Sequence, residues 1–128
     1  MCTESLTEDR REEFLDVFEA PESDAKRVYT FDSSELTALC PFDFGGPDYY
    51  DFTLRYIPDK KCIESKSLKQ YIESFRDVEI TAEELGAEMY NAFDQLMDPE
   101  SIYLRLEQAR RGGIEETVEY GDRSLSSV

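Results

Sequence analysis

The spacing of hydrophobic residues along this chain predicts most of its secondary structure. Aromatic and aliphatic residues alternate strictly with polar ones over residues 50–56, which is typical of a half-buried strand. The same alternation recurs over 102–107 and 114–120, on either side of a Gly-Gly turn. Residues that favour β structure also gather at 27–31 and 36–39, where they predict one or two further strands.

Two segments between these strands have a helical spacing instead. Residues 65–76 place apolar side chains at helical intervals, with Ser65 or Ser67 available as the N-cap. A second helix is predicted over 81–97, because a Thr-x-x-Glu capping box opens this segment and Pro99 follows it. The element order is therefore strand, strand, helix, helix, strand, strand.

This order predicts an α+β fold in which a four-stranded antiparallel sheet carries both helices on one face. Such a sheet has two open edges, and pairing between subunits would cover them, so we expect a homo-oligomer. We assign residues 24–121 to this domain, 1–23 to an acidic N-terminal arm and 122–128 to a polar tail. The arm is expected to fray, although apolar residues at 14–18 are compatible with a short helix before Pro21.

The charge balance narrows the range of partners. The chain has 30 acidic and 14 basic residues, which give a formal net charge of -16 and a pI near 4.2. A polyanion would meet a negative field over most of this surface, so general nucleic-acid binding is disfavoured. No apolar run is long enough for a membrane span or a secretory signal, and we therefore expect a cytoplasmic protein without membrane association.

The chain contains no histidine, which excludes Ser-His and Cys-His catalytic pairs and any histidine-ligated metal. Its cysteines, Cys2, Cys40 and Cys62, include no C-x-x-C pair, so neither a disulfide framework nor a cysteine zinc site is predicted. We therefore expect no metal, and any proton transfer must use carboxylates, tyrosine, cysteine or lysine.

Four of the five lysines in this acidic chain lie within residues 60–69. Lys66 and Lys69 are three residues apart, so they share a face of the predicted helix, and Arg76 lies roughly in line with them. A local positive potential of this kind indicates an anionic ligand such as a phosphate. The alternative is a solvated basic helix face, which is what most charge runs are.

Seven ordered blocks of sequence carry a resemblance that the spacing of hydrophobic residues does not provide. Together they resemble the NADPH-dependent 7-cyano-7-deazaguanine reductases in their short single-module form, and the match runs from about Val28 to Tyr120. The blocks are Leu-Thr-Ala-Leu-Cys-Pro at 36–41, Gly-Pro-Asp at 46–48, Tyr-Ile-Pro-Asp-Lys-Lys at 56–61, Glu-Ser-Lys-Ser-Leu-Lys at 64–69, Ser-Phe-Arg at 74–76, Leu-Met-Asp-Pro at 96–99 and Arg-Gly-Gly-Ile at 111–114.

The resemblance implies a tunnelling fold, in which subunits combine their sheets into a barrel with active sites between subunits. It also implies reduction of the nitrile of 7-cyano-7-deazaguanine to a primary amine with NADPH, a step of queuosine biosynthesis and thus of tRNA modification. The cysteine of the Leu-Cys-Pro block, here Cys40, would form a covalent thioimide, and Asp48 would supply protons. This chemistry is reasonable, because a nitrile carbon is a soft electrophile that a thiolate attacks well.

Most of the remaining site residues follow from the resemblance. For substrate binding it points to Glu83, and we add Glu64 as a carboxylate at the edge of the core or on the substrate side. For NADPH binding it points to Ser65, Lys66, Lys69 and Arg111, so the family argument and the lysine cluster meet on the same segment. For Cys40 alone, the alternative is a small buried residue at a strand end, and for Glu83 it is an acid in the first turn of a helix.

The chain departs from the family pattern at two places. The loop between Cys40 and Asp48 is one residue longer than usual, and Ala82 stands where the family has a histidine before the glutamate. Two other functions stay open. An amidinotransferase relative makes archaeosine from the nitrile base in tRNA without NADPH, and a non-catalytic binding module would leave the context of Cys40 unexplained.

Overall fold

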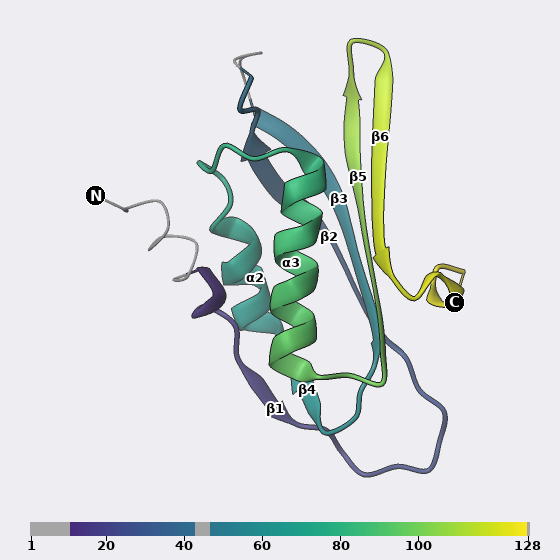
Figure 1. Ribbon diagram of the computed structural model, residues 1–128. Helices are drawn as coiled ribbons and strands as arrows, with labels where there is room; N and C mark the ends of the chain where they lie inside the picture. The colour runs from purple at the N-terminus through teal and green to yellow at the C-terminus, as the bar shows by residue number, and fades with distance from the viewer. Residues whose placement is uncertain (1–10, 43–46, 128) are drawn as a thin grey trace.

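The computed structural model describes residues 11–42 and 47–127, and it confirms the predicted α+β class. A four-stranded antiparallel sheet with the order β2-β3-β5-β6 carries two helices on one face (Figure 1). Its strands are β2 Tyr29–Leu39, β3 Pro47–Ile57, β5 Ser101–Arg111 and β6 Ile114–Gly121, and its helices are α2 Ser65–Glu73 and α3 Ala82–Met97. The predicted order of the main elements is therefore correct, and the predicted turn at residues 43–46 lies outside the described residues.

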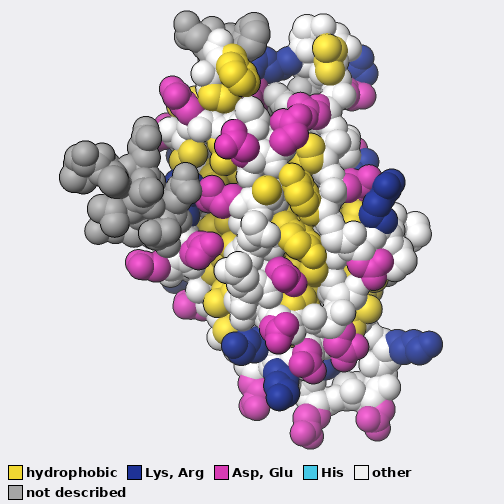
Figure 2. Space-filling view, in the orientation of Figure 1, with side chains coloured by type: hydrophobic (Ala, Val, Ile, Leu, Met, Phe, Trp, Pro, Cys, Tyr) yellow, Lys and Arg dark blue, Asp and Glu magenta, His cyan; other side chains and the backbone are white. Residues whose placement is uncertain are grey.

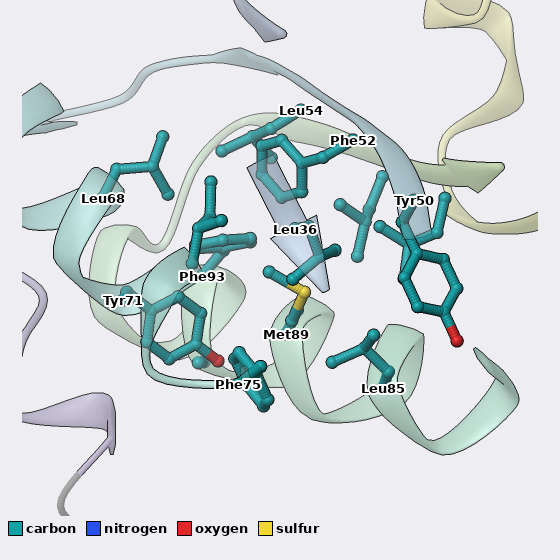
Figure 3. Close-up of a cluster of buried hydrophobic side chains, with 14 of the residues drawn as sticks. Leu36, Tyr50, Phe52, Leu54, Leu68, Tyr71, Phe75, Leu85, Met89 and Phe93 are labelled. Carbon is teal, nitrogen blue, oxygen red and sulfur yellow. The ribbon is translucent and has the colours of Figure 1, made fainter. Parts of the chain in front are cut away.

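The core lies between the sheet and the two helices, and the alternation along β3 decides which side chains enter it. Every second residue of β3 from Asp48 onward is buried, so Phe52 and Leu54 meet Met89 and Phe93 of α3 (Figure 3). Burial of one such side chain stabilises the fold by roughly 1.5–3 kcal/mol. The hydrophobic contact between the two layers is therefore the main source of stability.

The two helix starts differ in how well the sequence predicts them. Thr81 caps α3 as expected, because its Oγ1 accepts a hydrogen bond from the N–H of Glu84 at 3.1 Å. The cap of α2 is Glu64, not Ser65 or Ser67 as predicted: its carboxylate accepts from the N–H groups of Lys66 at 2.8 Å and Ser67 at 2.7 Å. These hydrogen bonds lower the pKa of Glu64, and a negative charge also suits the positive end of the helix.

The prediction of a frayed N-terminal arm is wrong for residues 11–19. Strand β1, Val17–Glu19, pairs with β4, Lys61–Ile63, in a small second sheet, and Leu15 is buried in the core. Arg11 is also buried, and its guanidinium donates two hydrogen bonds to the carboxylate of Glu88, both at 3.0 Å. Three-residue strands carry no readable periodicity, so hydrophobic spacing did not indicate this pairing.

The region after β6 is also fixed to the sheet. Residues Arg123–Leu125 form a 3-10 turn, and the side chain of Leu125 is buried. The guanidinium of Arg55 donates to the carbonyls of Leu125 at 3.0 Å and Ser126 at 2.7 Å. The boundaries of the three-part division into arm, domain and tail stay a prediction.

Strand β2 runs unbroken over both segments that were predicted as one or two strands, with a bulge between Ser33 and Leu36. The bulge adds residues to one strand of the pair and bends it, so it interrupts the pattern without ending the strand. None of the helices in the described part of the chain combines the length and the apolar character that a membrane span requires.

The contact between α3 and β6 at Gly86 gives a test of this architecture. A Cβ at Gly86 would lie 2.5 Å from Cε1 of Tyr120, whose ring stacks on Tyr90 and whose hydroxyl donates to the Glu83 carbonyl at 2.7 Å. Because this ring is held at two places, Gly86→Ala is expected to lower the free energy of unfolding by about 1–3 kcal/mol. Urea unfolding measures this change.

The matched control is Asn91→Ala, an exposed position on the same helix, which should leave stability unchanged or slightly raised. Alanine has a better helix propensity than glycine by about 1 kcal/mol. A Gly86→Ala variant as stable as the wild type would therefore show that the helix does not approach β6 this closely.

Candidate active site

One end of the sheet holds a cavity of about 600 Å³ in which the candidate catalytic residues meet. The end of β2, the start of β3, the first turn of α3 and the β5–β6 hairpin all lie at this end (Figure 1). Its lining includes Cys40, Asp48, Glu83, Arg111 and Glu116. A larger hollow of about 1210 Å³ follows residues 19–28, but its lining includes no cysteine and none of the predicted site residues.

A backbone connection holds the thiol beside the start of α3. The N–H of Leu39 donates to the carbonyl of Val78 at 2.8 Å, and the N–H of Ile80 donates to the carbonyl of Leu39 at 3.0 Å. Leu39 directly precedes Cys40, and Ile80 directly precedes the helix cap Thr81. These two hydrogen bonds therefore place the predicted nucleophile next to the helix that carries the predicted substrate-binding carboxylate.

The thiol of Cys40 is half-buried and faces hydrogen-bond donors. The N–H of Phe42 points at its Sγ at 3.4 Å, and the guanidinium of Arg111 also interacts with it. The thiol therefore lies at the cavity with a backbone N–H and a guanidinium directed at its sulfur.

Asp48 lies on the inward face of β3 and is paired with Arg111. Its side chain is 6% exposed, and its Oδ1 accepts a short hydrogen bond from Nη1 of Arg111. This hydrogen bond raises the pKa of Arg111. A register shift between Gln108 and Arg111 in β5 turns the arginine toward the pocket, which is a common effect of a bulge. Arg111, predicted as a cofactor contact, therefore lies with the predicted catalytic pair.

Two carboxyl groups in the lining of the cavity lie close together. Glu83, in the first turn of α3, and Glu116, on β6, share a hydrogen bond. This bond, with burial and the charges of Glu83 and Asp48, raises the pKa of Glu116 to about 7. The same hydrogen bond lowers the pKa of Glu83. The pair therefore supplies an acidic group that titrates near neutral pH.

Glu116 also belongs to a row of directly opposed residues that crosses three strands of the sheet. Tyr50 of β3 lies opposite Gln108 of β5, and Gln108 lies opposite Glu116 of β6. Directly opposed residues on adjacent strands have Cβ atoms about 5 Å apart. Tyr50 is 2% exposed, and its hydroxyl has no hydrogen-bond partner among residues 11–42 and 47–127.

The sequence analysis did not single out Gln108 and Glu116, which line the cavity, or Tyr50, which lies opposite Gln108. The sequence did contain one signal for Glu116. It lies two and four residues before Val118 and Tyr120, so all three side chains share the face of the strand that packs on the core. A polar residue that continues an inward-facing series is a candidate site residue. The strand register that brings these three residues into one row could not be read from the spacing alone.

The other predicted site residues lie elsewhere. Helix α2 begins beside β4, at the opposite end of the molecule from the β5–β6 turn, so Ser65, Lys66 and Lys69 do not line the cavity (Figure 1). Both lysines are exposed, and Nζ of Lys69 lies 3.2 Å from a carboxylate oxygen of Glu73. Glu64 caps the helix and does not face the cavity.

The lysines lie on a surface that carries many acidic side chains. Figure 2 shows acidic side chains spread over the helical face, with basic side chains mainly at its margins. The lysines at 60, 61, 66 and 69 are all exposed, which makes them available for contact with phosphate groups. In the part of the chain that the structure describes, no three cysteine, aspartate or glutamate side chains are grouped as metal ligands would be.

Comparisons with known proteins place this chain among its relatives. The family model for QueF-like proteins matches residues 47–126. The NADPH-dependent 7-cyano-7-deazaguanine reductase of Pelodictyon phaeoclathratiforme is 36% identical over 108 residues, which cover 84% of this chain and 92% of that protein. The reductase of the same name from Chlorobium luteolum is 38% identical over the same shares of the two chains.

A solved structure gives the fold independently. The crystal structure of the archaeosine synthase QueF-Like in its apo form has a TM-score of 0.69 to this chain and 18% identity. It covers 77% of this chain, which in turn covers 96% of that structure. The likeness confirms the predicted tunnelling fold. With the family match and two relatives above 30% identity, it leads to one conclusion: this chain belongs to the QueF-like family.

Proposed function

We propose that this protein reduces the nitrile of 7-cyano-7-deazaguanine to an aminomethyl group with NADPH, through a covalent thioimide on Cys40. The observation that carries the proposal is that one cavity brings together a thiol, the buried acid Asp48 and the carboxylate of Glu83. The relatives named for this reaction support it. The product would enter the modification of tRNA to queuosine.

The first step uses residues of the chain alone. The sulfur of Cys40 forms a bond to the nitrile carbon while one π bond of the nitrile breaks. Asp48 accepts the thiol proton and passes it to the nitrile nitrogen. The product is a neutral thioimide. Arg111 holds Asp48 in place for this transfer, and Glu83 accepts hydrogen bonds from the N–H edge of the ring.

NADPH would then supply the hydrides that reduce the carbon–nitrogen bond. Lys66 and Lys69 are the candidates for its phosphate groups, because they are exposed cations on an acidic surface. They lie away from the cavity of their own chain. We therefore propose a homo-oligomer in which α2 of one subunit faces the cavity of the next, with pairing at the open edges β2 and β6.

The central test is adduct formation at Cys40. The wild-type protein mixed with 7-cyano-7-deazaguanine should gain the mass of the base at this residue, and added NADPH should be oxidised in a time course followed by absorbance. Cys40→Ala should lose both signals, because no other described thiol lines the cavity. Cys62→Ala, a change at a buried cysteine outside the cavity, is the control and should retain both.

Two outcomes would oppose the proposal in different ways. An adduct without NADPH oxidation would favour the amidinotransferase function of the archaeosine branch. No adduct at any ionic strength would leave a binding role without covalent chemistry. Both salt extremes belong in the assay, because a protein of net charge -16 is strongly affected by screening.

The role of Asp48 predicts a loss of turnover without a loss of the fold. Asp48→Asn keeps the size of the side chain but cannot accept and pass on a proton, so turnover should fall by about 10²–10⁴-fold. Steady-state kinetics measure this, and circular dichroism checks the fold. The control is Asp51→Asn, an exposed position on the same strand, which should turn over normally. Equal activity in both variants would exclude Asp48 from proton transfer.

The role of the lysines predicts a change in affinity for the cofactor. Replacement of both Lys66 and Lys69 by alanine should raise the KM for NADPH by about tenfold or more, since a charge-assisted hydrogen bond is worth roughly 1.5–3 kcal/mol. Lys26→Ala, which removes the lysine outside the cluster, should leave KM unchanged. Light scattering on the same samples gives the oligomeric state. An unchanged KM in the double variant would place the phosphates elsewhere.

A further inference from the structure

We propose that Glu116 carries a proton in the free protein and, together with the carboxylate of Glu83, recognises a lactam edge of the bound base. Such an edge is a carbonyl oxygen beside a ring N–H. The inference rests on the proposed function and adds a substrate-positioning residue to it. It gives this histidine-free chain a proton donor next to its substrate-binding carboxylate.

The contact between the two carboxyl groups is the first observation. Glu83 comes from α3 and Glu116 from β6, and both line the cavity that holds Cys40. Their side chains share a hydrogen bond. An ionised carboxylate can only accept hydrogen bonds, so this bond requires a proton on one of the two groups. The hydroxyl of Tyr120 donates to the Glu83 carbonyl at 2.7 Å and fixes the distance between the two elements.

The buried phenol of Tyr50 is the second, independent observation. Buried hydroxyls nearly always have a hydrogen-bond partner, yet this one has none within the described residues. Figure 3 shows the hydroxyl pointing away from the hydrophobic cluster. Burial raises the pKa of Tyr50, and the charges of four cavity-lining residues raise it further, so the phenol stays protonated. Tyr50 does not itself line the cavity, but it lies behind Gln108 and Glu116, which do, so its hydroxyl is an unpartnered donor close to the carboxyl pair.

The surroundings of Glu116 raise its pKa, first through the hydrogen bond with Glu83, then through burial, and then through the charges of Glu83 and Asp48. The titratable and charged groups that face it are Glu83 from α3, Asp48 and Tyr50 from β3, Cys40 from the end of β2 and Arg111 from β5. Arg111 is the cation in this set, and it is paired with Asp48. Glu116 therefore sits among groups that disfavour a further negative charge.

The protonated pair is complementary to a lactam. The Glu116 hydroxyl can donate to the carbonyl oxygen of the base, while the Glu83 carboxylate accepts from the ring N–H and the neighbouring amine. When Glu116 loses its proton, two carboxylates face that carbonyl oxygen. Affinity should therefore fall as the pH rises through about 7, the pKa of Glu116.

The same proton has a consequence for stability. The pKa of Glu116 lies at about 7 in the folded protein and near 4.5 without its surroundings, so the folded state binds more protons between these values. The free energy of unfolding therefore decreases as the pH rises across this window. Glu116→Gln should remove this contribution while leaving a hydrogen bond to Glu83.

The test measures binding, not turnover. In a Cys40→Ala background, 7-cyano-7-deazaguanine should bind about tenfold more weakly at pH 8 than at pH 6 by calorimetry, because one proton with a pKa near 7 is required. Glu116→Gln should bind with nearly the same affinity at both pH values, since its amide donates without titrating. Glu115→Gln is the control: this exposed neighbour pairs with Arg110 at 3.2 Å and should keep the pH dependence.

A substrate analogue sharpens the assignment. An analogue without the ring carbonyl should bind with equal affinity to the Cys40→Ala protein and to the same protein with Glu116→Ala. The complete base should bind about tenfold more weakly to the Glu116→Ala protein at pH 6. Tyr50→Phe should weaken binding of the base by the same factor at both pH values.

Persistence of the pH dependence in Glu116→Gln would overturn this proposal and leave the proposed function intact. Absence of binding at every pH would overturn both. Titration of the glutamate carboxyls by NMR in the free protein adds a readout without ligand, in which a Glu116 that titrates near 4.5 also overturns the proposal.

Discussion

The antiparallel register of β3 against β5, and of β5 against β6, is the constraint on which the rest of the structure depends. Side chains on a strand alternate between two faces, so this register sends one continuous series of residues toward the helices. In the middle of the sheet the series is apolar and forms the core with Phe52 and Leu104. At the end of the sheet it becomes polar, with Asp48, Gln108 and Glu116. A slip by one residue would turn both the core and the cavity wall toward solvent.

The second constraint is the backbone connection between the end of β2 and the start of α3. The hydrogen bonds of Leu39 with residues 78 and 80 hold these two elements together at the point where the cavity opens. The thiol of Cys40 therefore sits on a strand end, and Glu83 on the first turn of a helix, while both are fixed by backbone contacts. A site built on rigid elements keeps its reacting groups in place better than a site built on loops.

The cavity gathers charge that the fold alone would not favour. Asp48 is buried with Arg111 as its partner, Glu83 and Glu116 share a hydrogen bond, and the nearby hydroxyl of Tyr50 has no partner among the residues that the structure describes. Each of these features reduces stability relative to an apolar residue of similar size. Apolar packing of α3 and α2 on the sheet offsets this loss. When several residues that reduce folding stability gather at one end of a sheet, they indicate a functional site.

The sequence by itself determined the main strands and helices and the capping box of α3, and its resemblance to a family led to the prediction that Cys40 and Asp48 are the reactive residues. Those features are local, because periodicities and motifs depend on neighbours along the chain. The tertiary structure decided the pairing of β1 with β4, the partnership of Arg111 with Asp48 and the placement of Glu116 against Glu83. These contacts join residues that are far apart in the chain, and they follow from strand register and helix packing, which no local pattern specifies.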